Sequence, residues 1–379
     1  MIGWFGAAMG VAALSVLGLA VAGDRALVMA LLLGAGFGLA LQRSRLCFLC
    51  ILRDAVRNGD PRGLLGILAA LAVGTLGYGI VFGAWLPNPA APALPPDAHI
   101  GPVSWVLVLA GIAFGLGMTL SGSCVSGHLY RLGEGSLRAP VALVGTALGF
   151  LAGFASWPAL YEAGIRDAPV VWLPHHLGYA GSIAASLAVL GLLALPLLAR
   201  LPAREADAGR LDPAEVLRRV FRRRWPAWAG GLAVGAIGAV AYLRTEPLGV
   251  TAAIGGGARA IGDGLGLLPS RLPGLDAFAG CGTAPDAILG NAVFVGGMVL
   301  AALVGAGLAG QIAFAWPGWR VQGRTLIGGI LLGWGAMLGL GCTVGVLLSG
   351  TMAAALSGWI FGGVTLATAA LTLRWRWDG

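Results

Sequence analysis

The cysteines are the side chains in this sequence whose types and spacing most clearly suggest chemistry. They stand at positions 47, 50, 124, 281 and 342. Two of them, Cys124 and Cys342, lie near the ends of the glycine-rich apolar segments 111–127 and 329–345, which align with a shift of 218 positions. The aligned pairs are Gly111 with Gly329, Gly115 with Gly333, Gly117 with Gly335, Leu120 with Leu338, Cys124 with Cys342, and Gly127 with Gly345. This match indicates an internal duplication in which each half contributes one cysteine.

Each of these two cysteines follows a run of small residues that predicts a break in a helix. Backbone N–H groups freed at a helix break can donate hydrogen bonds to an anion, and glycine lets a ligand approach them closely. A thiol at this position adds a weak S–H donor and a polarisable sulfur. A single buried cysteine is more often only a small apolar residue, but its duplication favours a binding role. Ser123 and Thr343 stand beside the two cysteines and are secondary candidates.

The other cysteines allow a second interpretation. Cys47-x-x-Cys50 has the spacing of a redox dithiol, so the alternative function is a membrane thiol oxidoreductase that uses Cys47 and Cys50. Cys281 lies in a glycine-flanked loop, where simple packing is the preferred interpretation and an entry contact the alternative. The odd, scattered set of cysteines argues against a disulfide framework. The four histidines lack metal-ligand spacing, so we expect no metal site.

The composition predicts a polytopic membrane protein. The 379 residues are 58% hydrophobic and 11% charged, with a mean hydropathy of +0.87, whereas globular domains carry about 25% charged residues. Sixty-five glycines suit close packing of helices in a lipid bilayer. The net charge of +8 is carried by arginines in short loops between apolar segments, which indicates membrane topology rather than nucleic-acid binding.

The apolar segments predict an all-α protein with about ten helical spans. The expected spans are 2–22, 26–42, 63–86, 102–121, 139–160, 178–199, 226–243, 285–314, 326–340 and 355–373. Arginines cluster after the second and sixth spans, and these clusters lie on the same side in this count. The positive-inside rule makes that side the cytoplasm, so both termini are expected there.

The count also gives the duplicated segments opposite directions across the membrane. We therefore expect two inverted-topology repeats, an arrangement that places transporter sites near the bilayer midplane. The expected units are a first transmembrane half over 1–200, a basic cytoplasmic linker over 201–225 and a second half over 226–379. The segments 43–58 and 246–264 are too polar or glycine-rich to face lipid, and we expect re-entrant half-helices there.

Three cysteine motifs carry a resemblance to a known family. Arg43-Ser-Arg-Leu-Cys47-Phe, Gly122-Ser-Cys-Val-Ser-Gly-His128 and Gly341-Cys-Thr-Val-Gly345 resemble, in the same order, those of the YeeE/YedE family of bacterial inner-membrane sulfur transporters. The resemblance implies uptake of thiosulfate or a related sulfur ion, relayed between cysteines. Carried over by position, the substrate-binding residues would be Cys47, Cys124 and Cys342. A cytosolic sulfur-carrier protein as the receiving partner is a further implication.

The residues are compatible with that function. Neutral thiols can donate to a dianion that thiolates would repel, and ordinary thiols are mostly protonated at neutral pH. Arg43 and Arg244 are secondary candidates that could attract the anion, although snorkelling to headgroups explains them equally well. No nucleotide-binding motif or cofactor site is visible, and we expect no enzymatic activity. A channel and a coupled carrier are both open, and a non-catalytic membrane subunit is a third possibility.

Overall fold

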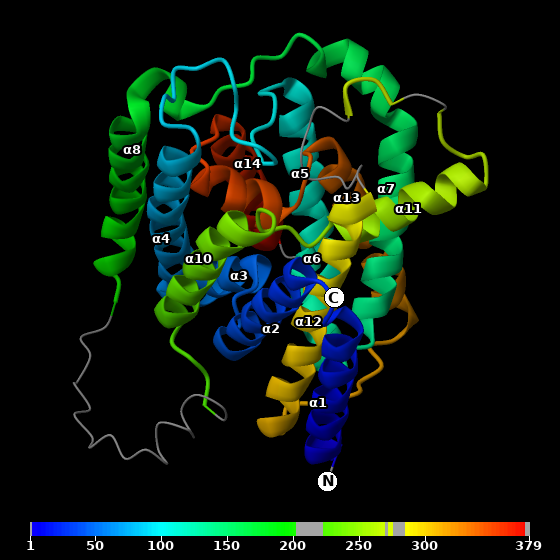
Figure 1. Cartoon of the computed structure of the whole chain (residues 1–379). Helices are drawn as coiled ribbons and strands as arrows, with labels where there is room; N and C mark the ends of the chain where they lie inside the picture. The colour runs from blue at the N-terminus through cyan, green and yellow to red at the C-terminus, as the bar shows by residue number, and fades with distance from the viewer. Residues whose placement is uncertain (1, 202–222, 270–271, 276–284, 376–379) are drawn as a thin grey trace.

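A computed structural model describes residues 2–201, 223–269, 272–275 and 285–375 of the chain, and these residues form a helical bundle (Figure 1). The elements are α1 (Ile2–Val21), α2 (Arg25–Ser44), α3 (Phe48–Asn58), α4 (Arg62–Trp85), α5 (Trp105–Ser121), α6 (Val125–Gly133), α7 (Arg138–Leu160), η1 (Tyr161–Ile165), α8 (Leu173–Leu198), α10 (Ala227–Arg244), α11 (Ala252–Gly264), α12 (Pro285–Leu308), α13 (Trp319–Leu338), η3 (Thr343–Gly350) and α14 (Leu356–Arg374). No β-strand occurs among the described residues, which agrees with the expected all-α class.

Every expected span coincides with a helix. Among the described residues, nine helices are long and apolar enough to cross a membrane, and α13 with η3 forms a tenth candidate that bends by 41°. The two largest differences from the expected boundaries are at the end of α12 and the start of α13. α12 ends at Leu308 because Gly310 takes a left-handed conformation, with a φ of 65°. α13 begins at Trp319 rather than 326, because its first turns include arginines that an apolar window leaves out.

Glycines allow close packing in two pairs of long helices, α2 with α12 and α4 with α10. α2 packs against α12, where a side chain at Gly34 or Gly38 would overlap backbone atoms of α12. α4 packs against α10, and Gly231 approaches the backbone of Gly66 in the same way. Because lipid provides no hydrophobic drive between helices, such close contacts supply much of the packing energy.

The helices of the duplicated segments also pack directly on each other. A Cβ on Gly117 of α5 would lie 2.7 Å from the Leu332 amide nitrogen of α13. A Cβ on Gly335 of α13 would lie 2.7 Å from the Ala110 carbonyl oxygen of α5. The aligned glycines therefore permit the crossing of the two helices that lead to Cys124 and Cys342. This contact fixes the positions of both cysteine-bearing turns.

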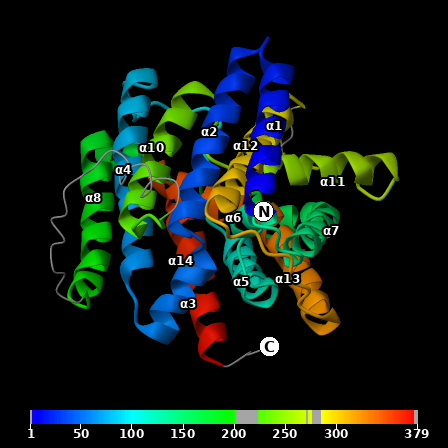
Figure 2. The same ribbon diagram turned by 90° about the horizontal axis from the view of Figure 1, so that it is seen from below.

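Short helices fill the remaining part of the bundle. α3 and α11 occupy the two segments expected to be re-entrant, and both views show α11 projecting from the side of the bundle (Figures 1 and 2). Their placement relative to a membrane stays a prediction. α6 and η3, which follow Cys124 and Cys342, lie in segments for which the sequence predicted only loops. The linker predicted over 201–225 falls mostly outside the described residues, and the division into halves also stays a prediction.

Candidate functional site: three cysteines at the starts of short helices

Three cysteines share one position in the local fold. Cys47, Cys124 and Cys342 are the residues immediately before α3, α6 and η3, and each has an extended or near-extended backbone conformation. A residue with positive φ lies two positions before each cysteine: Arg45 at 51°, Gly122 at 85° and Leu340 at 60°. Such a turn redirects the chain between two helices, and for Arg45 and Leu340 it is a strained conformation. The three motifs therefore share a left-handed residue that places each cysteine at the start of a short helix. The thiol of Cys342 accepts a hydrogen bond from a first-turn amide, whereas those of Cys47 and Cys124 make no such capping bond.

Cys47 and Cys124 form a single cluster. Their Sγ atoms are 4.0 Å apart, and both residues are completely buried. Ser123 places its Oγ 3.1 Å from the Cys47 Sγ, and Ser126 places its Oγ 3.3 Å from the Cys124 Sγ. The cluster thus contains two thiols and two hydroxyls from separate segments of the chain. Cys47, Cys124 and Ser123 were candidates from the sequence pattern, and the structure brings these three residues together.

Glycine at position 127 makes room for this cluster. A Cβ at Gly127 would lie 2.9 Å from the Cys47 Sγ and 3.4 Å from the Cys124 Sγ, and would overlap the Ser123 hydroxyl. The aligned Gly345 has a similar neighbourhood, because a Cβ there would lie 3.0 Å from the His99 ring. Both glycines of the duplicated motif therefore border buried polar groups rather than apolar side chains.

Arg131 supplies a positive charge beside this cluster. Its Nη2 lies 2.8 Å from the Cys50 Sγ, and its guanidinium carbon lies 5.9 Å from the centroid of the Tyr130 ring. Cys50 lies one turn after Cys47, with its thiol next to the Cys47 thiol. The sequence analysis had not singled out Arg131, because an arginine at the end of an apolar segment has the same pattern as a topology signal. All four described cysteines are free thiols.

Cys342 has different neighbours. Its Sγ accepts a hydrogen bond from the Val344 amide at 3.4 Å, and the hydroxyl of Thr251 and the backbone of Val250 lie beside it. The Thr343 side chain is completely buried and its Oγ1 has no hydrogen-bond partner. Cys342 and Thr343 were predicted, whereas Thr251 was not.

His99 is another buried polar residue near Cys342 that the sequence did not reveal as part of this site. It belongs to the loop between α4 and α5, and a Cβ at Gly341 or Gly249 would lie 3.5 Å or 3.7 Å from its ring. Burial lowers the pKa of His99 to about 4, so its imidazole is neutral at physiological pH. No group of three or more potential metal ligands occurs in the described part of the chain.

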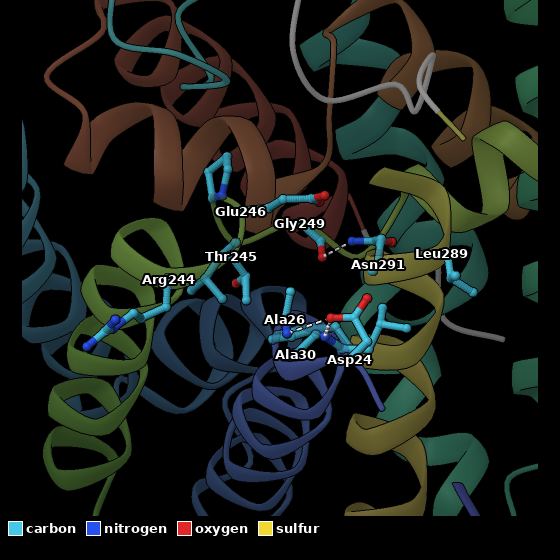
Figure 3. Close-up of a pocket in the computed structure, with 14 residues that line it drawn as sticks. Asp24, Ala26, Ala30, Arg244, Thr245, Glu246, Gly249, Leu289 and Asn291 are labelled. Atoms are coloured by element: carbon cyan, nitrogen blue, oxygen red, sulfur yellow. Dashed lines mark hydrogen bonds between the residues drawn. The ribbon is translucent and has the colours of Figure 1, made fainter. Parts of the chain in front are cut away.

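The two arginines predicted near the path lie in different environments. Arg43 is buried and donates hydrogen bonds to the carbonyl oxygens of Gly305 at 3.3 Å and Arg223 at 2.6 Å. These bonds tie α2 to α12 and to the segment before α10. Arg244 is exposed, and Figure 3 shows its side chain extending away from the other residues of a nearby pocket. Their proposed roles in attracting an anion stay predictions. Cys281 lies outside the described residues.

That pocket has a volume of about 290 Å³ and lies between the start of α2, the loop after α10 and α12 (Figure 3). Asp24 lines it and caps α2, accepting a hydrogen bond from the Ala26 amide at 2.8 Å. Burial, and secondly the negative charge of Asp97, raises the pKa of Glu246 to about 7. Asn291 of α12 also lines the pocket, and its side-chain amide donates a hydrogen bond to the carbonyl oxygen of Gly249 in the loop after α10. Gly249 also lines the pocket, so the pocket reaches the segment that leads to Thr251, whose hydroxyl lies beside Cys342.

Comparison with known proteins supports the resemblance found in the sequence. The profile of a family described as sulphur transport matches residues 43–371. A thiosulfate transporter TsuA from Spirochaeta thermophila is 28% identical over 350 residues, which cover 87% of this chain and 93% of the relative. A second TsuA, from Escherichia coli, is 26% identical over 355 residues, covering 87% and 89%. A probable transporter YedE from Salmonella typhimurium is 32% identical over 110 residues, covering 29% and 25%.

These relatives are transporters, and they give no support to the alternative of a thiol oxidoreductase using Cys47 and Cys50. The family profile covers the three cysteines and the short helices that follow them. With its many apolar helices, this chain is a multi-pass membrane protein that belongs to the sulphur transport family, the YeeE/YedE family.

Proposed function

We propose that this chain imports thiosulfate, or a closely related small sulfur-containing ion, across the bacterial inner membrane along a route lined by Cys47, Cys124 and Cys342. The observation that carries the proposal is the shared turn, in which each cysteine is buried and lies at the start of a short helix. The names of the two TsuA relatives support thiosulfate as the substrate class.

The electrostatics of these turns suit a small anion. The N-terminus of a helix carries a partial charge of about +0.5 and unpaired N–H donors. A neutral thiol adds a weak hydrogen-bond donor and a soft sulfur surface, whereas a thiolate would repel the dianion. Arg131 offers a full positive charge at the Cys47 and Cys124 cluster. Such a site attracts a sulfur-bearing anion without a metal or cofactor.

Movement along the route requires several weak sites rather than one strong site, because an ion that binds too tightly does not leave. The 4.0 Å between the Cys47 and Cys124 sulfurs is short enough for one ion to contact both thiols. Cys342 belongs to the other duplicated segment and would provide a further site. We propose that the ion passes between these sites by exchanging one hydrogen-bond donor for the next.

We further propose that the two halves form inverted-topology repeats around this route. The paired packing of α2 on α12 and α4 on α10 supports this, as does the crossing of α5 with α13. Inverted repeats commonly form transporter sites at the interface between the halves. Both termini and the basic segment 201–225 would then face the cytoplasm, where a sulfur-carrier protein could receive the ion.

The charge of the substrate determines how much free energy its inward movement requires. Moving one negative charge inward against 100 mV costs about 2.3 kcal/mol, so a dianion costs about 4.6 kcal/mol. Accumulation therefore requires consumption of the ion in the cytosol or coupling to a driving ion. Movement down a concentration gradient does not require consumption of the ion, so a purified system with a thiosulfate gradient, and with the driving ion present if the protein is a coupled carrier, will reveal it.

The direct test uses proteoliposomes that contain the purified protein and sulfur-35 thiosulfate outside. We expect uptake well above that of empty liposomes, competition by unlabelled thiosulfate and weaker competition by sulfate. Cys124→Ala should lose most of this uptake. The matched control is Ser186→Ala, which also removes one heavy atom from a buried side chain, but on α8 and at a hydroxyl without a partner. Uptake equal to that of empty liposomes by the wild-type protein would refute the proposed function.

A further inference from the structure

Four short helices in this fold begin next to buried residues that can donate a hydrogen bond. Three of these residues are the cysteines described above, and the fourth is Thr251, which precedes α11. Thr251 is only 2% exposed. In chain order, α11 lies between the long helices α10 and α12, just as α3 lies between the long helices α2 and α4. Thr251 is therefore the counterpart of Cys47 in chain order, with a hydroxyl in place of a thiol.

The hydroxyl of Thr251 does not cap its own helix. A threonine at this position commonly accepts a hydrogen bond from an amide in the first turn, but Thr251 makes no such side-chain bond. Asn291 of α12 performs this role instead. Its Oδ1 accepts a hydrogen bond from the Ala253 amide at 3.0 Å, and its Nδ2 donates to the Gly249 carbonyl oxygen at 2.8 Å (Figure 3). The amide of Asn291 thus fixes the backbone on both sides of Thr251, and the Thr251 hydroxyl is not used to cap α11.

The Thr251 hydroxyl lies beside the Cys342 thiol. The two residues form a pair in the second half that corresponds to the contact between Cys47 and Cys124 in the first. Two more buried polar atoms near this pair have no hydrogen-bond partner: Oγ1 of Thr343, which follows Cys342, and Nδ1 of His99, whose ring lies against Gly249 and Gly345. A buried polar atom without a partner is costly, and a bound ion would provide partners for these groups.

We propose that Thr251 is a substrate-binding residue that donates a hydrogen bond to an oxygen atom of the ion when its sulfur contacts Cys342, and that Asn291 is the positioning residue for Thr251. The inference rests on the proposed function and specifies the substrate class of the same route. A hydroxyl is a stronger donor to oxygen than a thiol, and a thiol is the softer contact for sulfur. The pair therefore selects ions that present both oxygen and a terminal sulfur, as thiosulfate does.

The first test compares initial rates of thiosulfate uptake by proteoliposomes over a range of concentrations. Thr251→Val keeps the shape of the side chain but removes the hydroxyl, and it should raise KM about tenfold, the size expected for a lost hydrogen bond to a charged ligand. Thr251→Ser should restore KM to within about twofold of wild type. The control is Thr75→Val, at a buried hydroxyl of α4 that has no partner, where we expect an unchanged KM.

The second test uses Asn291→Leu, which removes both side-chain bonds that fix the loop and frees the Ala253 amide to compete for the Thr251 hydroxyl. We expect KM to rise about as much as in Thr251→Val, and the double variant to be no worse than either single variant, because residues that act through one contact are not additive. An unchanged KM in Thr251→Val, or KM effects of the two substitutions that multiply, would overturn the inference while wild-type uptake stands. Absence of wild-type uptake would instead refute the proposed function.

Discussion

The Sγ atoms of Cys47 and Cys124 lie 4.0 Å apart, although 77 positions separate the residues in the sequence. The contact depends on two turns of the same design, one after α2 and one after α5, each with a left-handed residue two positions before the cysteine. Because the two sulfurs are so close, a ligand that contacts one thiol also contacts the other. Both thiols are buried and have hydroxyl neighbours.

The space at Gly127 provides a test of that pair. Gly127→Ala should reduce thiosulfate uptake about tenfold or more, because its Cβ would lie 2.9 Å from the Cys47 Sγ and displace the cluster. Uptake and thermal unfolding of the purified variant are measured together. Gly257→Ala is the matched control, since a Cβ there has no neighbour within 4 Å, and it should keep wild-type uptake. Normal transport by Gly127→Ala would show that the geometry of this cluster is not required.

Substitution of Cys50 distinguishes a transport mechanism based on binding from one based on thiol redox chemistry. Its thiol accepts a hydrogen bond from Arg131, and a serine oxygen can accept the same bond. Cys50→Ser should therefore keep thiosulfate uptake within about twofold of wild type. A twofold change in rate corresponds to less than about 0.5 kcal/mol of activation free energy, since about 1.4 kcal/mol corresponds to a tenfold change. A dithiol mechanism predicts the opposite, because serine cannot form a disulfide. Loss of uptake in Cys50→Ser, with normal uptake in Ser186→Ala, would contradict this account.

Glu246 should make folding stability depend on pH. Burial, and then Asp97, raises its pKa from 4.5 to about 7, so the folded protein binds a proton more readily than the unfolded chain. Its contribution is fully present below pH 4.5 and is lost as pH rises through about 7. In detergent, the difference in Tm between Glu246→Gln and wild type should therefore grow in favour of the variant as pH rises from 5 to about 8. A pH-independent difference would show that Glu246 is not buried as described.

Much of the fold follows from the sequence, because the length of an apolar helix is constrained by the bilayer it must cross. All ten expected spans are helices, and the cysteine turns lie where glycines and serines interrupt the apolar segments. The short helices α6 and η3 were missed because they follow the glycine and serine breaks at which the expected spans end. Irregular turns between two helices leave little periodic signal.

The residues that surround the cysteines were harder to predict. Arg131 was indistinguishable from a topology signal, and His99 lies in a proline-rich loop without any ligand spacing. Thr251 depends on Asn291, which lies 40 positions later and caps the first turn of α11 from a different helix. Sequence patterns report neighbours within one element, whereas these contacts exist only after distant helices have packed. Cys124 and Cys342 were visible because the segments 111–127 and 329–345 share a recognisable sequence pattern.

The central claim is that one route uses cysteines from both duplicated segments in series. The most direct measurement is thiosulfate uptake into proteoliposomes by Cys124→Ala, Cys342→Ala and the double variant, prepared side by side with Ser186→Ala. For sites in series, each single variant should lose about 90% of wild-type uptake or more, and the double variant should fall little further. Substantial uptake by either single variant, with a much lower rate in the double variant, would indicate independent sites and would contradict the single cysteine-lined route.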